Sequence, residues 1–164
     1  TSVRRGLRTL TNASGFAGLI PNVGANVAEC LDDAQTIDDV AAVPGRLVDV
    51  KGRAMVPGEP EFGVSEHVAS VLLAAREAGA SARGAVNVQY APETIEALAA
   101  DHPTVAFDPE RSTREAVAAA VESAEETSGD TLVLYQTGAV GVEPIAYVLA
   151  PTAADAADIV RELI

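Results

Sequence analysis

The residues best suited to chemistry gather at the start of one predicted helix. A turn-rich approach over 57–63 runs into an apolar segment over 64–79, whose spacing predicts a helix. Ser65 is a candidate N-cap, because its hydroxyl can accept a hydrogen bond from a free amide of the first turn. His67 would lie in that turn, where unpaired amides and the helix macrodipole attract an anion. A capped core helix with an incidental histidine is the alternative interpretation.

Two further segments suggest that the anion is a phosphate. Pro44-Gly45-Arg46 is a turn that presents an arginine, the side chain best shaped to hold a phosphate in two places. The loop 136–145 follows a predicted strand, and its glycines would let backbone amides approach a ligand, although such loops are also common as plain turns. The sequence therefore favours a phosphate site built from Arg46, His67, the amides after Ser65 and the loop that contains Gly138 and Gly141.

The composition excludes several classes of partner and site. A length of 164 residues suits one domain. A net charge of -13 argues against a nucleic-acid or anionic membrane surface on this domain, since phosphate backbones are bound by Lys and Arg. The single cysteine excludes an intrachain disulfide, and with only two histidines we expect no metal site. Cys30 is interpreted as a packing residue, with a nucleophile as the alternative.

The cations are distributed unevenly. Ten of the eleven basic residues are arginine, and Lys51 is the only lysine. An acidic, lysine-poor and alanine-rich composition is what we expect of a cytoplasmic protein that works in high salt, with an ordinary acidic mesophile as the alternative. No stretch approaches the roughly 20 apolar residues that a membrane span needs, so we expect no membrane contact.

Strands alternate with helices along most of the chain. This alternation predicts an α/β layered domain with a sheet covered by helices, and an early strand pair over 47–56 suggests that the sheet is mixed. A turn into a strand is predicted over 19–31, and further strands are predicted at 84–90, 104–108 and 131–135. Helices are predicted at 3–11, 64–79, 92–98, 112–127 and 152–163.

Two parts of the chain are distinguished. Residues 1–18 are interpreted as an N-terminal helix and a connection, because the chain opens on Thr1 and three arginines fall within 3–11. We expect this segment to lead from an upstream domain that is missing from the sequence, with an exposed first helix as the alternative. Residues 19–164 are interpreted as the ligand-binding domain.

Five motifs, taken together and in order, resemble the ThiN family, the archaeal type of thiamine-phosphate synthase domain. Each motif is modest alone, but the resemblance runs through nearly the whole chain. The segments that carry it are Leu19-Ile20-Pro21-Asn22-Val23-Gly24-Ala25-Asn26, 39–46 ending in Pro44-Gly45-Arg46, Phe62-Gly63-Val64-Ser65-Glu66-His67-Val68-Ala69, Ala85-Val86-Asn87-Val88 and Gly141-Val142-Glu143-Pro144.

The resemblance implies a fold, a reaction and a set of residues. It implies an α/β domain that associates, here as a homodimer, and a reaction that joins hydroxymethylpyrimidine pyrophosphate to thiazole phosphate and releases pyrophosphate. Arg46 and His67 are then the expected catalytic residues. No cofactor is required for binding, and Mg²⁺ could accompany a pyrophosphate ligand. The implied ligand-binding residues are Asn26, Arg46, Ser65, His67, Asn87, Gly138, Gly141 and Glu143.

Several residues depart from the enzymatic pattern of the family. The chain has no tryptophan, where enzymatic members carry a Trp-Gly segment before the last strand. Ala139, Val142 and Gln89 stand where those members tend to carry Asp, Lys and Arg. Groups suited to a departing pyrophosphate are therefore missing.

These departures lead to a choice between two functions. A second branch of the family places a similar domain behind a helix-turn-helix, and the sequence 138–149 is similar to that branch. We therefore predict a domain that binds thiamine phosphate, thiamine diphosphate or their phosphorylated pyrimidine or thiazole precursors. It would be the ligand-sensing part of a transcriptional regulator and would contact DNA only through the missing upstream domain. The alternative is a thiamine-phosphate synthase that forms the C-terminal domain of a phosphomethylpyrimidine kinase fusion. A third hypothesis is a domain that only holds a dimer together.

Overall fold

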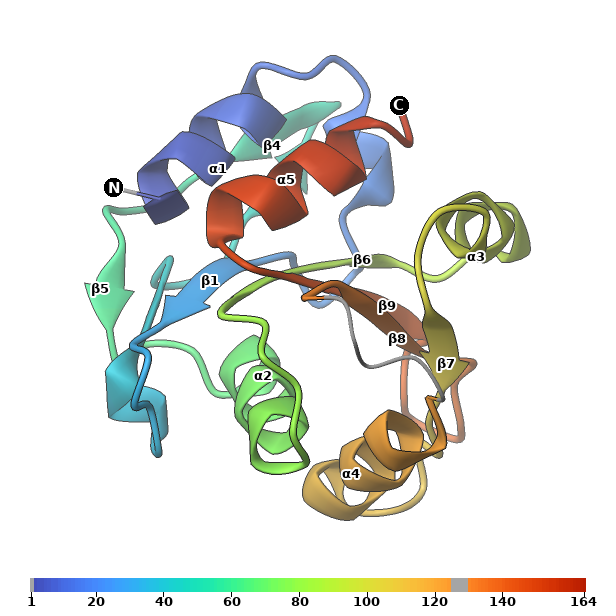
Figure 1. The fold of residues 1–164 in the computed structure, drawn as a ribbon. Coiled ribbons are helices and arrows are strands. Elements are labelled where there is room, and N and C mark those ends of the chain that lie inside the picture. Colours follow the sequence, from blue (N-terminus) through green and yellow to red (C-terminus); the bar gives the residue numbers. More distant parts are fainter. Residues whose placement is uncertain (1, 125–129) are drawn as a thin grey trace.

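The computed structural model describes residues 2–124 and 130–164, and it confirms a single α/β domain with a mixed sheet flanked by helices (Figure 1). Seven strands form the main sheet in the order β5-β2-β1-β6-β9-β8-β7, and β3 pairs with β4 as a separate hairpin. The strands are β1 (Val27–Cys30), β2 (Val40–Ala42), β3 (Val48–Val50), β4 (Arg53–Met55), β5 (Glu61–Phe62), β6 (Gly84–Gln89), β7 (Thr104–Ala106), β8 (Leu132–Gln136) and β9 (Ile145–Ala150).

The sheet is mixed for a reason that differs from the one predicted. β7 and β8 pair in parallel, while the other neighbours in the sheet are antiparallel. The early strand pair over 47–56 forms as expected, with Lys51 and Gly52 at its turn, but it stands outside the main sheet. The main sheet is mixed, as predicted. The strand pair that suggested this does not belong to it, so the reason for the prediction was wrong.

β9 is a central strand that was not predicted from the sequence. It lies between β6 and β8 in the middle of the sheet, and all six of its residues are buried. A strand buried on both faces is a continuous apolar run without the alternation that marks a half-buried strand. The loop 136–145 therefore leads into a strand and not directly into the closing helix.

The helices form two layers, one on each face of the sheet (Figure 1). Helices α1 and α5 pack together on one face, and α2 and α4 pack together on the other. Side chains of α3 join the core on the α1 and α5 side. The helices are α1 (Ser2–Thr11), α2 (His67–Glu77), α3 (Pro92–Ala99), α4 (Thr113–Ser123) and α5 (Ala153–Arg161), with short 3-10 turns η1 (Phe16–Leu19) and η2 (Ile37–Asp39).

One predicted helix boundary needs correction. Helix α2 begins at His67, and its N-cap is Glu66, not Ser65. The Ser65 hydroxyl nevertheless accepts a hydrogen bond from the amide of Ala69 at 3.4 Å, so it serves the first turn from one position earlier. Helix α4 is capped by Ser112, as its spacing predicts, and ends at Ser123; the predicted end at Thr127 lies outside the described residues.

The N-terminal segment is packed into the domain. Val3, Leu7 and Leu10 of α1 are buried in the core that α5 also lines. Gly6 allows this close approach, because a Cβ there would lie 3.1 Å from the carbonyl oxygen of Ala153. A connection from 1–18 to an upstream domain stays a prediction.

Two further observations bear on the excluded classes. Cys30 is buried, and burial raises the pKa of its thiol, which supports packing over the nucleophile alternative. Within residues 2–124 and 130–164, no helix combines the length and apolar character needed to cross a bilayer.

Candidate functional site

Arg46 is held by a tight turn that gives it an unusual backbone. The amide of Arg46 bonds the carbonyl of Val43, and Pro44-Gly45 occupy the centre of this turn with Gly45 at φ 76°. Arg46 itself adopts φ 63°, a left-handed conformation that costs a non-glycine residue about 1–2 kcal/mol. Such strain persists where the surrounding structure enforces it, and it is found at functional sites.

The Arg46 side chain lies over the neighbouring turn 21–24. Its Nη1 donates to the carbonyl of Val23 at 2.7 Å. Gly24, at φ 92°, leaves room for the stem of Arg46, since a Cβ on Gly24 would lie 3.0 Å from the Arg46 Cβ. Because this hydrogen bond uses one terminal nitrogen, the guanidinium keeps donors for a ligand.

Two buried asparagines fix both turns to the sheet. Asn26 accepts from the amide of Val43 at 2.9 Å and donates to the carbonyl of Val43 at 3.0 Å. Asn87 of β6 accepts from the amide of Asn26 at 2.6 Å and donates to the carbonyl of Gly24 at 3.2 Å. Both side chains form hydrogen bonds with backbone groups of the two turns, and in this way they position Arg46. A direct contact of either side chain with a ligand stays a prediction.

Glu143 holds the same turn from the other side. Its carboxylate accepts from the amide of Asn22 at 2.8 Å and from the amide of Val23 at 3.1 Å. Gln136 anchors the β8–β9 loop, donating to the carbonyl of Glu143 and accepting from the amide of Gly138, each at 2.6 Å. The loop with Gly138 and Gly141 is therefore joined to Arg46 through Glu143 and the turn 21–24.

His67 contacts a residue that the sequence analysis did not select. Its Nε2 is hydrogen-bonded to the hydroxyl of Tyr147, which lies on β9 and is 1% exposed. The two ring centroids are 5.5 Å apart. His67 itself remains exposed to solvent, so one edge of the imidazole faces the protein and the rest is open to a ligand.

The charge of Arg46 acts on both of these rings. Partial burial of the imidazole, and then the nearby Arg46 guanidinium, lower the pKa of His67 below its ordinary value. Burial raises the pKa of Tyr147 well above that of a free tyrosine, and Arg46 opposes this increase. At neutral pH the site therefore combines a permanent cation, a neutral imidazole and a protonated phenol, which suits an anionic ligand.

The structure brings most of the expected site residues into one contact network. Arg46, Asn26, Asn87 and Glu143 belong to it, Gly138 is attached through Gln136, and His67 is connected through Tyr147, which pairs with Asn87 in the sheet. Ser65 is buried two residues before His67 and bonds the helix start. Tyr147 could have been found from the sequence, because a tyrosine inside a buried apolar run needs a hydrogen-bond partner.

The three departures from the enzymatic pattern also lie around this network. Gln89 donates to the carbonyl of Ile20 at 2.7 Å, next to the turn 21–24. Ala139 and Val142 pair through their backbones at the tip of the β8–β9 loop. These positions contribute no side-chain charge.

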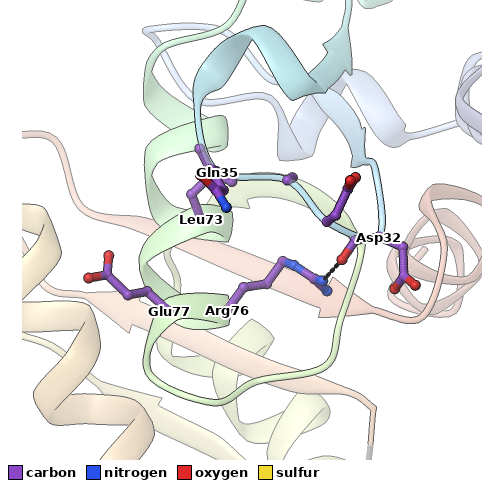
Figure 2. A pocket seen from close by; sticks show the side chains of 7 residues that line it. Asp32, Gln35, Leu73, Arg76 and Glu77 are labelled. Atoms are coloured by element: carbon purple, nitrogen blue, oxygen red, sulfur yellow. Dashed lines mark hydrogen bonds between the residues drawn. The ribbon is translucent and has the colours of Figure 1, made fainter.

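A hollow of about 440 Å³ lies at the other end of α2 (Figure 2). Asp32 and Arg76 line it, and Arg76 lies nine residues beyond His67, about 14 Å along the helix. The Arg76 guanidinium donates to the carbonyls of Asp32, Ser81 and Ala82, so it ties two loops to the helix. Because the other charged residues lining the hollow are acidic, it is unsuited to a phosphate.

A metal centre is not suggested by the arrangement of side chains. Among the described residues, no three His, Cys, Asp or Glu side chains are grouped so that they could hold an ion. Participation of Mg²⁺ bound to a pyrophosphate ligand stays a prediction.

The chain resembles two characterised proteins along its length. The thiamine-phosphate synthase ThiN of Methanothermobacter thermautotrophicus is 29% identical over 99% of this chain and 90% of its own length. The bifunctional thiamine biosynthesis protein ThiDN of Methanocaldococcus jannaschii is 33% identical over 88% of this chain, which spans only 35% of that larger protein.

Two solved structures have a fold similar to that of this chain. The C-terminal domain of protein MJ0236 matches with a TM-score of 0.86 and 30% identity, over 99% of this chain and 91% of that one. The C-terminal domain of a phosphomethylpyrimidine kinase matches with a TM-score of 0.84 and 25% identity, over 99% and 96% of the two chains. A family model described as thiamine-phosphate synthase ThiN matches residues 2–162, and this chain belongs to the ThiN family.

Proposed function

We propose that this chain is a thiamine-phosphate synthase domain that joins hydroxymethylpyrimidine pyrophosphate to thiazole phosphate and releases pyrophosphate. The observation that carries the proposal is the link between Arg46 and His67: His67 bonds Tyr147, the sheet partner of Asn87, and Asn87 holds the turn beneath Arg46. The relatives described above, one a synthase by name and one the C-terminal domain of a phosphomethylpyrimidine kinase, support it further. This reaction was the alternative in the sequence analysis, and it now has more support than the regulator hypothesis.

The chemistry of the reaction fits the groups present. The thiazole nitrogen uses its lone pair to form a bond to the pyrimidine methylene carbon, and the carbon–oxygen bond to pyrophosphate breaks with its electron pair leaving on oxygen. No proton must be removed from the attacking nitrogen, so no general base is needed there. Charge develops on the departing pyrophosphate, and donors aimed at that charge lower the barrier.

Arg46 and His67 supply donors of this kind. Arg46 is held by the turns 21–24 and 43–46, so little reorganisation is needed when a ligand binds. Its guanidinium can hold a phosphate in two places. His67 lies beside it, neutral at physiological pH, and can donate to a phosphate oxygen. Asn26, Asn87 and Glu143 keep the turns around Arg46 in place, and Tyr147 holds His67.

The sensor hypothesis retains one observation in its favour. Gln89, Ala139 and Val142 supply no charge around the site. A domain with fewer charged groups could bind a thiamine phosphate without completing the reaction. In that case Arg46 and His67 would serve recognition alone, and DNA would be contacted by an upstream domain.

One experiment separates these functions. The purified domain is incubated in high salt with both substrates, with and without Mg²⁺, and the thiamine phosphate formed is quantified by mass spectrometry. Calorimetry separately measures the binding of thiamine phosphate to the domain. Product that rises with enzyme concentration and disappears when either substrate is omitted is expected. Binding without product would replace the proposal with the sensor, and neither binding nor product would overturn both. Light scattering on the same sample tests the proposed homodimer.

A further inference from the structure

We propose that Tyr147 is a positioning residue that holds His67 as its neutral Nδ1–H tautomer, so that His67 serves the substrate phosphate as a hydrogen-bond donor and not as a proton-transferring acid or base. The part that concerns the substrate rests on the proposed function. The part that concerns the tautomer rests on the geometry of the two rings and can be tested alone.

Tyr147 is held by its two neighbouring strands and by the core between the sheet and the layer that contains α2. It lies in the middle of β9, opposite Asn87 of β6 and Leu134 of β8, and is 1% exposed. Its ring also packs against Phe107, with centroids 6.0 Å apart. The hydroxyl is directed at His67 Nε2, the one hydrogen-bond partner recorded for it among the described residues.

Burial determines the direction of this hydrogen bond. A buried hydroxyl whose hydrogen finds no acceptor loses the free energy of a hydrogen bond with water. If Nε2 carried a proton, the hydroxyl hydrogen of Tyr147 would lack an acceptor among the described residues. The hydroxyl therefore donates to Nε2, and Nε2 must be the unprotonated nitrogen of the imidazole.

Burial and a neighbouring charge keep the ring neutral. Burial lowers the pKa of the His67 imidazole, and the Arg46 guanidinium lowers it further by disfavouring a second positive charge there. Glu66, which precedes His67, is exposed to solvent. The high pKa of Tyr147 keeps its phenol protonated and able to donate. With Nε2 unprotonated and the ring neutral, the single proton lies on Nδ1.

The Nδ1–H group is available to a ligand. No described residue accepts a hydrogen bond from it, and His67 is exposed at the start of α2. Nε2 is already occupied by Tyr147. His67 therefore presents a donor, and the permanent charge of Arg46 lies beside it. Of the two roles open to a histidine at a departing pyrophosphate, donation to an oxygen is the one this geometry supports.

The test uses nitrogen NMR of ¹⁵N-histidine-labelled protein. The chain has only two histidines, so in the His102→Gln variant all histidine ring signals come from the two nitrogens of His67. The expected spectrum at neutral pH is that of a neutral ring protonated at Nδ1. Tyr147→Phe, which removes only the hydroxyl, should move the proton toward Nε2. Added inorganic pyrophosphate should shift the Nδ1–H resonance of the parent protein.

A matched control is offered by Tyr135→Phe. Tyr135 is a half-buried tyrosine of β8 that stacks on Tyr90. It packs against the core on the α1 and α5 side of the sheet, whereas Tyr147 lies in the core on the α2 and α4 side. Its loss of a hydroxyl should leave the His67 tautomer and the synthase rate unchanged. Tyr147→Phe should lower kcat by about 10- to 100-fold with little change in KM. The substitution takes the proton away from Nδ1 of His67, and one donor aimed at the developing charge is worth about that much or more.

The outcomes distinguish this inference from the proposed function. A His67 ring protonated at Nε2 in the parent protein, or an unchanged tautomer in Tyr147→Phe, overturns the inference whether or not the domain makes thiamine phosphate. Because the spectrum of the parent protein decides the tautomer, the inference is tested even if Tyr147→Phe fails to fold. Absence of product with the expected tautomer would overturn only the proposed reaction.

Discussion

The amide of Asn26 donates to the Oδ1 of Asn87 at 2.6 Å, across 61 residues of sequence. This bond joins the start of β1 to the middle of β6, beneath the turns that carry Arg46. The polar network is buried, with Asn26 2% and Asn87 1% exposed. A site for a charged ligand is therefore built on a satisfied polar network at one end of an apolar core.

Asn87→Leu should destabilise the domain strongly. The substitution leaves the amide of Asn26 and the carbonyl of Gly24 without their partners, at about 1–3 kcal/mol for each buried group. We expect a loss of about 2–6 kcal/mol in the free energy of unfolding, measured by urea denaturation. Asn22→Leu makes the same change at an exposed residue whose recorded bond uses its backbone, and it should cost far less. Equal losses in the two variants would contradict the role given to Asn87.

Arg46→Lys should weaken the binding of thiamine phosphate by about 10- to 100-fold while the fold is kept. Lysine has the same Cβ, so the strained backbone at φ 63° is no worse, and the positive charge remains. What is lost is the planar fork that holds a phosphate in two places, worth about 1.5–3 kcal/mol for a charged hydrogen bond. Calorimetry measures the change. Arg53→Lys, on the exposed hairpin strand β4, is the control that should bind as the parent does; full affinity in Arg46→Lys would remove Arg46 from the site.

Local signals predicted the elements better than their arrangement. The strand pair within 47–56 and the helix that starts at Ser112 follow from residue types over a few positions, and both are found. β9, like β6, is an apolar run without alternation, which periodicity cannot distinguish from a buried helix segment, and β9 was missed. The pairing of Asn26 with Asn87, and of His67 with Tyr147, depends on the sheet order, which no short segment encodes. The family motifs pointed to Arg46 and His67, but not to the residue that orients His67.

His67 should make stability depend on pH in the window just below 6.5. Its pKa in the folded state lies below the ordinary value of 6.5, so the unfolded chain takes up this proton first as the pH falls. The free energy of unfolding then decreases from pH 6.5 down to the folded pKa, and above 6.5 the effect is absent. The lowered pKa of Asp39 starts from 3.8 and acts in a lower range. Urea denaturation between pH 5 and pH 7.5 should show this slope in the parent protein and in His102→Gln, and a flatter one in His67→Gln. Parallel curves for all three proteins would show that His67 titrates normally.

Gly84→Ala should destabilise the domain by about 3 kcal/mol or more, the upper end for overpacking. Gly84 begins β6, between Glu29 of β1 and Ala150 of β9. A Cβ there would lie 2.1 Å from the carbonyl carbon of Thr152 and 2.2 Å from the amide nitrogen of Ala153, and backbone atoms at the start of α5 cannot move aside cheaply. Because 1 kcal/mol corresponds to about 2–4 °C at this chain length, the melting temperature should fall by about 6–12 °C or more. Gly18→Ala is the matched control, since a Cβ on Gly18 meets nothing within 4 Å, and its melting temperature should stay within about 2 °C of the parent. Equal melting temperatures for the two variants, by differential scanning calorimetry, would mean that α5 is not seated against β6 as described.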